Sequence, residues 1–426
     1  MSTLRIKLSI FLNYFVFAIL LNSVGTVILL VQTSFNVSKS QVAVLEPFKD
    51  MSIAIVSFLV TSFITRIGYK KAMLIALGFI TIVCFAMPFS GSLLMVELLF
   101  ASIGSSFALI KMSVYGSIGL ITNNEKDHIS FMNFVESFFG VGIVVSYFIF
   151  PLFIDKNDAA STSWLRVYFL LGGISLLAFI LLFISPLDES ASKSNQPAEN
   201  LLNDFGKMFR LFISPLVLIF IFCAFFYVLL EQSIMSWLPT FNNDVLKLNQ
   251  VLSIQMASIL AGSIAVGRFV AGILLKKFNW LAVLIVCLLC AGSLVIFAMP
   301  AIKEFLSNYK GSGITRLADV PLIAYIFPLI GLVLAPIYPA INSVILSSLP
   351  KPKHGLMAGL IIVFSALGGS TGSLITGNIF QAYGGQTAMY FSLIPIGILI
   401  ICLFIFSRIQ KKSTAAPVTF SSAAGH

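Results

Sequence analysis

Long apolar segments dominate this chain and decide what it can fold into. Runs of roughly 20 apolar residues recur along the sequence, and at 1.5 Å per residue a helix of that length crosses about 30 Å of hydrocarbon. Hydrophobic residues make up 58% of the 426 residues and charged residues only 10%, whereas soluble domains carry about 25% charged residues. A water-soluble surface cannot be built from this composition, so the sequence predicts an all-α integral membrane protein that lies in a lipid bilayer.

Polar and Gly/Pro-rich interruptions divide the chain into twelve predicted transmembrane helices. Their approximate bounds are 7–31, 41–64, 72–89, 93–122, 128–152, 164–184, 210–238, 249–274, 279–299, 320–347, 355–380 and 386–407. An even number of spans puts both termini on one side. If that side is the cytoplasm, cytoplasmic loops hold about twice as many Lys and Arg residues as exterior loops, as the positive-inside rule requires. We therefore expect a multi-pass, monomeric protein of a bacterial inner (cytoplasmic) membrane.

One polar stretch, "SPLDESASKSNQPAENLLNDFGKMFR" at 185–210, separates the sixth predicted span from the seventh. Its charged, Ser/Asn-rich composition is typical of a linker. The predicted organisation is thus an N-terminal six-helix bundle (1–184), a cytoplasmic linker (185–209), a C-terminal six-helix bundle (210–408) and a cytoplasmic tail (409–426). This plan resembles the fold of the major facilitator superfamily, which holds its substrate between two such halves.

Several motifs resemble one branch of that superfamily, the fucose/galactose/glucose:proton symporters. In the second half they are "FFYVLLEQSIMSWL" at 225–238, "GRFVAGILLKKFN" at 267–279, "YPAINSVILSSL" at 338–349 and "GLMAGLIIVFSALGGSTGSLITG" at 355–377. In the first half they are "SKSQVAVLEPFKD" at 38–50, "RIGYKKAM" at 66–73 and "MNFVESFFGVG" at 132–142. The resemblance implies proton-coupled symport of a sugar or sugar derivative.

The chain departs from these relatives at charged positions. Relatives carry an acidic residue where this chain has Gly25 and another where it has Lys111, while Glu136 stands where they have a neutral amide. The loop after the second span keeps Arg66, Gly68 and Lys70 of the superfamily's gating motif, with Thr65 in place of the usual aspartate. The sequence therefore predicts the fold more firmly than it predicts the substrate or the coupling ion, which is a proton or sodium.

Lys111 and Glu136 are predicted to form an ion pair inside the membrane. They lie about 11 and about 9 residues from the short loop that joins the fourth and fifth spans, so their depths agree within roughly 3 Å. The pair either locks two helices together or faces the central cavity and contacts substrate. The predicted substrate-binding residues are Lys111, Tyr115, Asn133, Glu136, Asn22 and Asn342.

Further ionisable residues fall inside predicted spans, where each costs roughly 2.5–3.5 kcal/mol unless it has a partner or water. Glu46, Lys49 and Asp50 have a spacing that lets the lysine compensate both carboxylates, in a gate or at a solvated entrance. Glu231 is assigned to a gate or pocket, with structural hydrogen bonding as the alternative, and Arg268 is placed to snorkel toward phosphates. The predicted coupling or gating residues are Glu136, Glu231, Glu46, Asp50, Lys49 and Arg66.

The motifs favour a secondary transporter over an enzyme. The chain has no GxxxxGK[ST] loop, its paired buried charges lack a local HExxH or GxSxG pattern, and its three histidines lie near or outside the predicted membrane edges. Cys287 and Cys290 lack the further ligands of a metal site, so no cofactor or metal is expected. The net charge of +10 sits in short loops and forms no nucleic-acid-binding face. The open alternatives are a transporter of a small organic anion, which Lys111 favours, and a non-transporting membrane sensor.

Overall fold

The computed structural model describes residues 2–61, 64–89, 91–121, 125–187, 189, 212–308, 320, 322–349 and 354–415. Within these ranges the regular structure is helical and includes no β-strand. The predicted all-α class is therefore confirmed. Most of the predicted linker and part of the predicted tail lie outside the described residues, so the division into two bundles with a linker stays a prediction.

Ten helices among the described residues are long and apolar enough to cross a membrane. The second and fifth predicted spans correspond to α4 (Leu45–Thr61) and α8 (Glu125–Ile149). Three charged residues lie in the first two turns of α4, and the apolar part of the fifth span is confined to Ser137–Phe153. A multi-pass membrane protein is confirmed, while the count of twelve spans is confirmed only in part.

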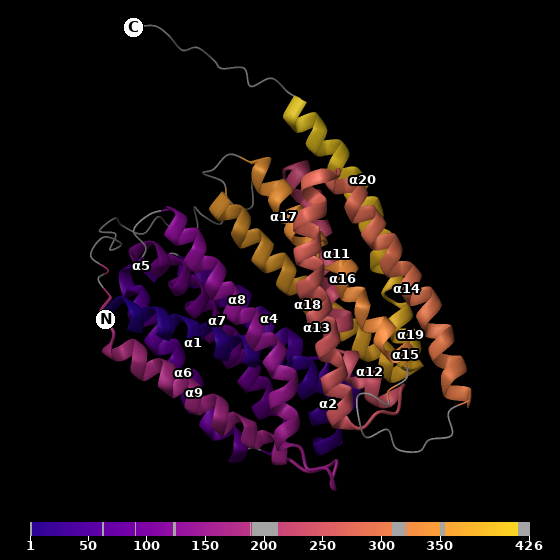
Figure 1. Cartoon of the computed structure of the whole chain (residues 1–426), viewed down its shortest axis with the longest axis horizontal. Helices are drawn as coiled ribbons and strands as arrows, with labels where there is room; N and C mark the ends of the chain where they lie inside the picture. Colours follow the sequence, from indigo (N-terminus) through magenta and orange to yellow (C-terminus); the bar gives the residue numbers. More distant parts are fainter. Residues whose placement is uncertain are drawn as a thin grey trace, which may run out of the picture.

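The helices before the predicted linker form one group, coloured indigo to magenta in Figure 1. Their bounds are α1 Ser2–Asn22, α2 Val24–Phe35, α3 Lys39–Val42, α4 Leu45–Thr61, α5 Ile64–Ile67, α6 Tyr69–Ala86, η1 Met87–Phe89, α7 Leu93–Ile121, α8 Glu125–Ile149, η2 Phe150–Phe153, η3 Ser163–Arg166 and α9 Val167–Ile184. Helix α1 packs on α8 and α9, and α7 packs on α4 and α6. We call this set the N-terminal group.

The helices after the linker form the C-terminal group, coloured salmon to yellow in Figure 1. Their bounds are α11 Pro215–Met235, α12 Leu238–Asp244, α13 Gln250–Lys277, α14 Trp280–Asn308, α15 Leu322–Ile326, η6 Phe327–Leu329, α16 Ile330–Leu334, α17 Ile337–Ser347, α18 His354–Tyr383, α19 Gly385–Tyr390 and α20 Leu393–Ala415. Helix α11 packs on α18 and α20. The predicted tenth span is divided into α15, η6, α16 and α17, because its prolines lack the backbone N–H that a continuous helix needs.

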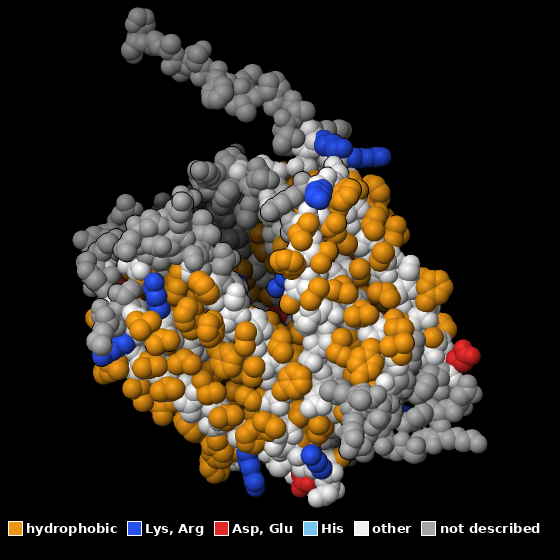
Figure 2. All heavy atoms as spheres, viewed as in Figure 1, with side chains coloured by type: hydrophobic (Ala, Val, Ile, Leu, Met, Phe, Trp, Pro, Cys, Tyr) orange, Lys and Arg blue, Asp and Glu red, His pale blue; other side chains and the backbone are white. Residues whose placement is uncertain are grey.

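The two groups contact each other at one end of the molecule and separate toward the other. Helix α18 packs against α3 and α4, and α12 packs against α2. Figure 2 shows a hollow between the groups, with acidic and basic side chains visible inside it. We call the end that carries α2, α3 and α12 the outer end, and the end that carries the start of α1 and the end of α20 the inner end, following the predicted orientation.

Buried tryptophans strengthen the packing of the outer end. The Trp237 indole N–H donates to the Ser373 carbonyl oxygen at 3.1 Å, and the Ser373 hydroxyl donates to the Ala43 carbonyl oxygen at 3.4 Å. Ser373 thus connects the buried Trp237 of its own group to Ala43 of the N-terminal group. Within the N-terminal group, the Trp164 indole N–H donates to the Ser34 hydroxyl at 3.0 Å.

Candidate functional site

Three charged residues at the start of α4 lie buried between the two groups. Glu46, Lys49 and Asp50 are 0%, 6% and 9% exposed. They occupy neighbouring i, i+3 and i+4 positions of one helix, so their side chains share a face. We call them the charged cluster. Their role, in a gate or at a solvated entrance, stays a prediction.

The charged cluster joins the N-terminal group to the C-terminal group. The Lys49 ammonium contacts a Glu46 carboxylate oxygen and lies 3.5 Å from a carboxylate oxygen of Asp50. Glu46 also accepts hydrogen bonds from the Gln232 amide and, at 2.8 Å, from the Ser236 hydroxyl, both on or next to α11. Glu46 therefore contacts polar groups of both groups of helices. For Asp50, the ammonium of Lys49 is the nearest charge-compensating group among the described residues.

Glycines allow the helices around the charged cluster to approach closely. A Cβ atom at Gly369 of α18 would lie 2.5 Å from an Asp50 carboxylate oxygen and 3.2 Å from Cγ of Gln232. A Cβ atom at Gly25 of α2 would lie 2.9 Å from the Ser236 carbonyl oxygen. An acidic side chain at Gly25, as in the symporters that the chain resembles, would therefore collide with the backbone beside α11. In this chain Glu46 brings a carboxylate to the same neighbour.

The charged cluster holds two carboxyl groups against one ammonium group. With both carboxyl groups ionised, the cluster has a net charge of −1, and an uncompensated charge in a buried site is costly. One added proton makes the cluster neutral. The arrangement can therefore link a proton to the packing of α4 against α11 and α18.

A second polar group, which we call the tyrosine cluster, lies on α11, α17 and α18. The Tyr227 hydroxyl donates to a Glu231 carboxylate oxygen at 2.9 Å, and the Tyr227 ring stacks on Tyr338 with centroids 5.5 Å apart. The Tyr338 hydroxyl hydrogen bonds to the Ser365 hydroxyl at 2.8 Å. Asn342 contacts Tyr338, and its amide oxygen is buried without a hydrogen-bond partner in the described part of the chain. That oxygen is available to a ligand hydroxyl group.

Glu231 has a hydrogen bond that suits either of its predicted roles. Arg268 of α13 also lies close enough to act on it electrostatically. The side chain of Arg268 is exposed, so a position in which it reaches toward lipid phosphates remains an alternative interpretation.

Lys111 lies half-buried on α7 among aromatic rings. Its ammonium nitrogen is 5.8 Å from the Phe107 ring centroid and 6.0 Å from the Tyr115 centroid. Such cation–π contacts contribute about 0.5–2 kcal/mol. The rings therefore help to accommodate the lysine charge, a contact that sequence reasoning missed although Phe107 and Tyr115 are i−4 and i+4 to it.

Four other predicted site residues give less information. The Asn22 amide donates to the Ala18 carbonyl oxygen of its own helix at 2.8 Å. The side chains of Asn133, Glu136 and Arg66 lie outside the described residues. The ion pair between Lys111 and Glu136 consequently stays a prediction.

The loop that resembles the gating motif is fixed to the inner end of α9. Gly68 has a φ of +92°, which permits the turn between α5 and α6. The Lys70 ammonium donates to the carbonyl oxygens of Phe183 (3.1 Å) and Ser185 (2.7 Å), and the Lys70 backbone N–H donates to a Glu189 carboxylate oxygen at 2.6 Å. The lysine thus compensates carbonyl groups at the helix C-terminus.

Sequence reasoning also missed the partners of the charged cluster. Gln232 and Ser236 are four residues apart, and this spacing places both on one face of a helix. The shared polar face of Gln232 and Ser236 could have been detected from the sequence, but no sequence pattern indicates that this face contacts Glu46.

A model of the Major Facilitator Superfamily matches residues 9–314. The chain belongs to this superfamily. Among curated proteins, a Protein TsgA homolog of Buchnera aphidicola subsp. Schizaphis graminum is 23% identical over 381 residues, covering 89% of this chain and 90% of that protein. A TsgA homolog of Buchnera aphidicola subsp. Baizongia pistaciae is 24% identical, with coverages of 94% and 95%.

Three solved structures illustrate the shared fold. A variant of the nucleoside transporter NupG superimposes with a TM-score of 0.74 at 14% identity, covering 96% of this chain and 100% of its own. The xylose transporter XylE of E. coli, in an inward open conformation, superimposes with a TM-score of 0.70 at 12% identity, covering 95% of this chain and 96% of its own. The transporter FucP in the outward conformation superimposes with a TM-score of 0.58 at 16% identity, covering 96% of this chain and 99% of its own. The three proteins are named as transporters, and these likenesses show that the chain shares their fold.

Proposed function

We propose that this protein is a proton-coupled secondary transporter that carries a small, polar, uncharged solute, a sugar or sugar derivative, by alternating access. Its superfamily, the hollow between the two groups and the polar residues along that hollow support the proposal. The named sugar and nucleoside transporters of the same fold support the class of solute.

The described conformation corresponds to a state open at the inner end. Polar contacts such as those of Glu46 with Gln232 and Ser236 join the groups toward the outer end. Transport then requires the outer contacts to break and the inner ends to close.

The charge balance of the charged cluster is the observation that carries proton coupling. When the outer end is open, water solvates Glu46 and Asp50, and both carboxyl groups are ionised. Closure buries two acids with one lysine, and uptake of one proton removes the excess negative charge. Asp50 is the proposed acceptor because its contact with Lys49 is long, at 3.5 Å, whereas Glu46 has several donors. Proton entry from the outside is thereby linked to closure, and coupling is completed when the proton leaves Asp50, whose side chain keeps 12% exposure, toward the open inner end before the outer end reopens.

The tyrosine cluster provides neutral hydrogen-bonding groups for the solute. Hydroxyl groups of Tyr338 and Ser365 and the buried amide oxygen of Asn342 suit ligand hydroxyl groups, which both donate and accept. A small organic anion is the second candidate solute, because Lys111 offers a cation on the opposite group of helices. Counterflow with neutral and anionic solutes separates these two candidates.

The test uses purified protein in proteoliposomes with D-glucose, D-galactose, L-fucose, D-xylose and uridine as solutes. Asp50→Asn imitates the protonated carboxyl group, so we expect loss of accumulation driven by a pH gradient and retention of counterflow exchange. Asp155→Asn, in the exposed loop before η3, is the matched control and should keep both. Accumulation by Asp50→Asn equal to that of the native chain would contradict the role of Asp50, and absence of counterflow for every solute would contradict the sugar-transporter proposal.

A further inference from the structure

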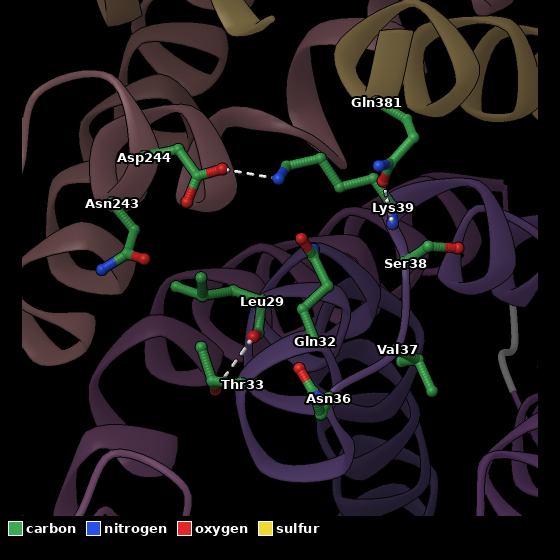
Figure 3. A pocket seen from close by; sticks show the side chains of 10 residues that line it. All are labelled: Leu29, Gln32, Thr33, Asn36, Val37, Ser38, Lys39, Asn243, Asp244 and Gln381. Carbon is green, nitrogen blue, oxygen red and sulfur yellow. Dashed lines mark hydrogen bonds and ion pairs between the residues drawn. The ribbon is translucent and has the colours of Figure 1, made fainter.

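A separate polar cavity, whose lining includes no residue of either cluster, lies at the outer end (Figure 3). Its volume is about 410 Å³, within the range of about 300–1,000 Å³ typical of ligand pockets. Residues of both groups line it: Leu29, Gln32, Thr33, Asn36, Val37, Ser38, Lys39, Asn243, Asp244 and Gln381. Most of these side chains carry amide or hydroxyl groups. Those of Gln32, Thr33, Ser38 and Asn243 also bond within the protein, so a ligand would use their remaining donor and acceptor positions.

The charges of this outer cavity compensate each other. The Lys39 ammonium lies 2.7 Å from a carboxylate oxygen of Asp244, and Figure 3 shows this ion pair crossing the cavity between the two groups. The Lys39 backbone N–H donates to the Gln381 side-chain oxygen at 3.0 Å. A neutral ligand is therefore favoured over an ion, because neither charge is left for a charged ligand to neutralise.

The wall formed by the N-terminal group is held in a defined conformation. Asn36 has a left-handed backbone conformation with φ of 50°, which asparagine tolerates better than most residues. The next helix begins with a capping box, in which the Ser38 hydroxyl accepts from the Gln41 N–H and the Gln41 side chain accepts from the Ser38 N–H. The cavity is thus preorganised at the loop between α2 and α3.

The cavity exists only while the outer ends of the two groups meet. Around it, the Gln32 amide donates to the Thr240 hydroxyl at 3.1 Å, and the Gln250 amide donates to the Thr33 hydroxyl at 2.7 Å. Separation of the outer ends would break these contacts and pull the walls apart. A ligand that contacts both walls must therefore favour the outer-closed state.

We propose that the outer cavity is a second binding site for a neutral polyhydroxylated solute, distinct from the central site at the tyrosine cluster, and that its occupation stabilises the outer-closed conformation. The solute class rests on the proposed function. At high external concentration the occupied site delays reopening of the outer end, so uptake should pass through a maximum and then fall as the solute concentration rises.

The test measures how fast a charged, membrane-impermeant methanethiosulfonate reagent modifies a cysteine in the cavity wall. Gln381→Cys reports on the cavity, Asn157→Cys in the exposed loop before η3 is the matched control, and the native chain is the blank. D-Glucose, D-galactose, L-fucose and D-xylose are each tested as protecting ligands. At ten times the midpoint of protection, mass action predicts modification about tenfold slower for Gln381→Cys and unchanged for Asn157→Cys.

A further variant separates direct protection from a conformational effect of central binding. Asn342→Ala weakens the central site, so protection of Gln381→Cys that persists in the double variant supports a separate outer site. Protection that disappears with Asn342→Ala, or that none of the four sugars produces, overturns the proposal. Counterflow without protection of Gln381→Cys would reject the outer site and leave the transporter proposal intact. Protection of Gln381→Cys without counterflow would support the outer site and contradict the transporter proposal.

Discussion

Replacing Ser236 by alanine removes a single hydrogen bond between the two groups of helices. The Ser236 hydroxyl donates to Glu46 at 2.8 Å, and its side chain is buried. Nearby on α11, Ser233 is equally buried, but its hydroxyl donates to the Leu229 carbonyl oxygen of the same helix at 2.7 Å. Ser233→Ala is therefore a matched control that changes the same atoms without touching the interface.

The expected magnitude follows from the ionised acceptor. A hydrogen bond to a charged group contributes about 1.5–3 kcal/mol net, and each 1.4 kcal/mol is about a tenfold change in an equilibrium constant. The bond exists only when the outer end is closed, so its loss should raise the ratio of outer-open to outer-closed molecules roughly tenfold to a hundredfold. Ser233→Ala should leave this ratio almost unchanged, because its bond is present in both states.

Pulsed electron paramagnetic resonance can measure this ratio. Spin labels at Asn157 and Tyr383, which are exposed near the outer ends of the two groups, report the distance between the groups. For Ser236→Ala we expect a larger population at long distance than for Ser233→Ala. Equal distance distributions in the two variants would refute the assignment of this bond as an outer contact that must break during transport.

Three further predictions address the remaining residues. Substituting Lys111 or Glu136 alone should strand a buried charge and cost up to roughly 3–5 kcal/mol of stability. If Lys111 only neutralises Glu136, the double variant Lys111→Met with Glu136→Gln should regain both stability and solute affinity. We expect it to regain stability but not affinity, as measured by thermal unfolding and solute binding. Gly369→Ala would place Cβ against the aspartate of the charged cluster, so we expect uptake to fall severalfold, whereas Gly173→Ala on α9, where nothing lies within 4 Å, should transport normally. A cysteine at Ser194 should be labelled only from the cytoplasm, and labelling in intact cells would contradict the predicted orientation.

The fold could be predicted from the sequence because hydrocarbon imposes one requirement on every span. An apolar segment of about 20 residues must satisfy its own backbone groups, and a helix does so without partners. The lengths of the apolar segments therefore predict the membrane-spanning helices, and the charges of the loops predict their orientation. Glu46, Lys49 and Asp50 reduce the hydropathy of the second span, and the reason for their presence becomes visible only from the hydrogen bonds that Gln232 and Ser236 donate to Glu46.

The candidate site was less predictable because its contacts join distant parts of the chain. The spacing of Glu46, Lys49 and Asp50 predicts a local ion cluster, and the structure contains it. The bond from Ser236 to Glu46 spans 190 positions in sequence. Helical periodicity gives the face on which a side chain lies but not the helix that this face meets, so such a contact needs the tertiary fold.

The buried indole of Trp237 gives this protein a built-in optical reporter. Its N–H donates to Ser373, whose hydroxyl reaches Ala43 in the other group, so separation of the outer ends admits water beside this ring. Trp280 lies at the inner start of α14 against Phe406 and is distant from those contacts. A red shift of the emission from Trp237, with Trp164 and Trp280 replaced by phenylalanine, would follow each opening of the outer end in the unlabelled protein and in real time.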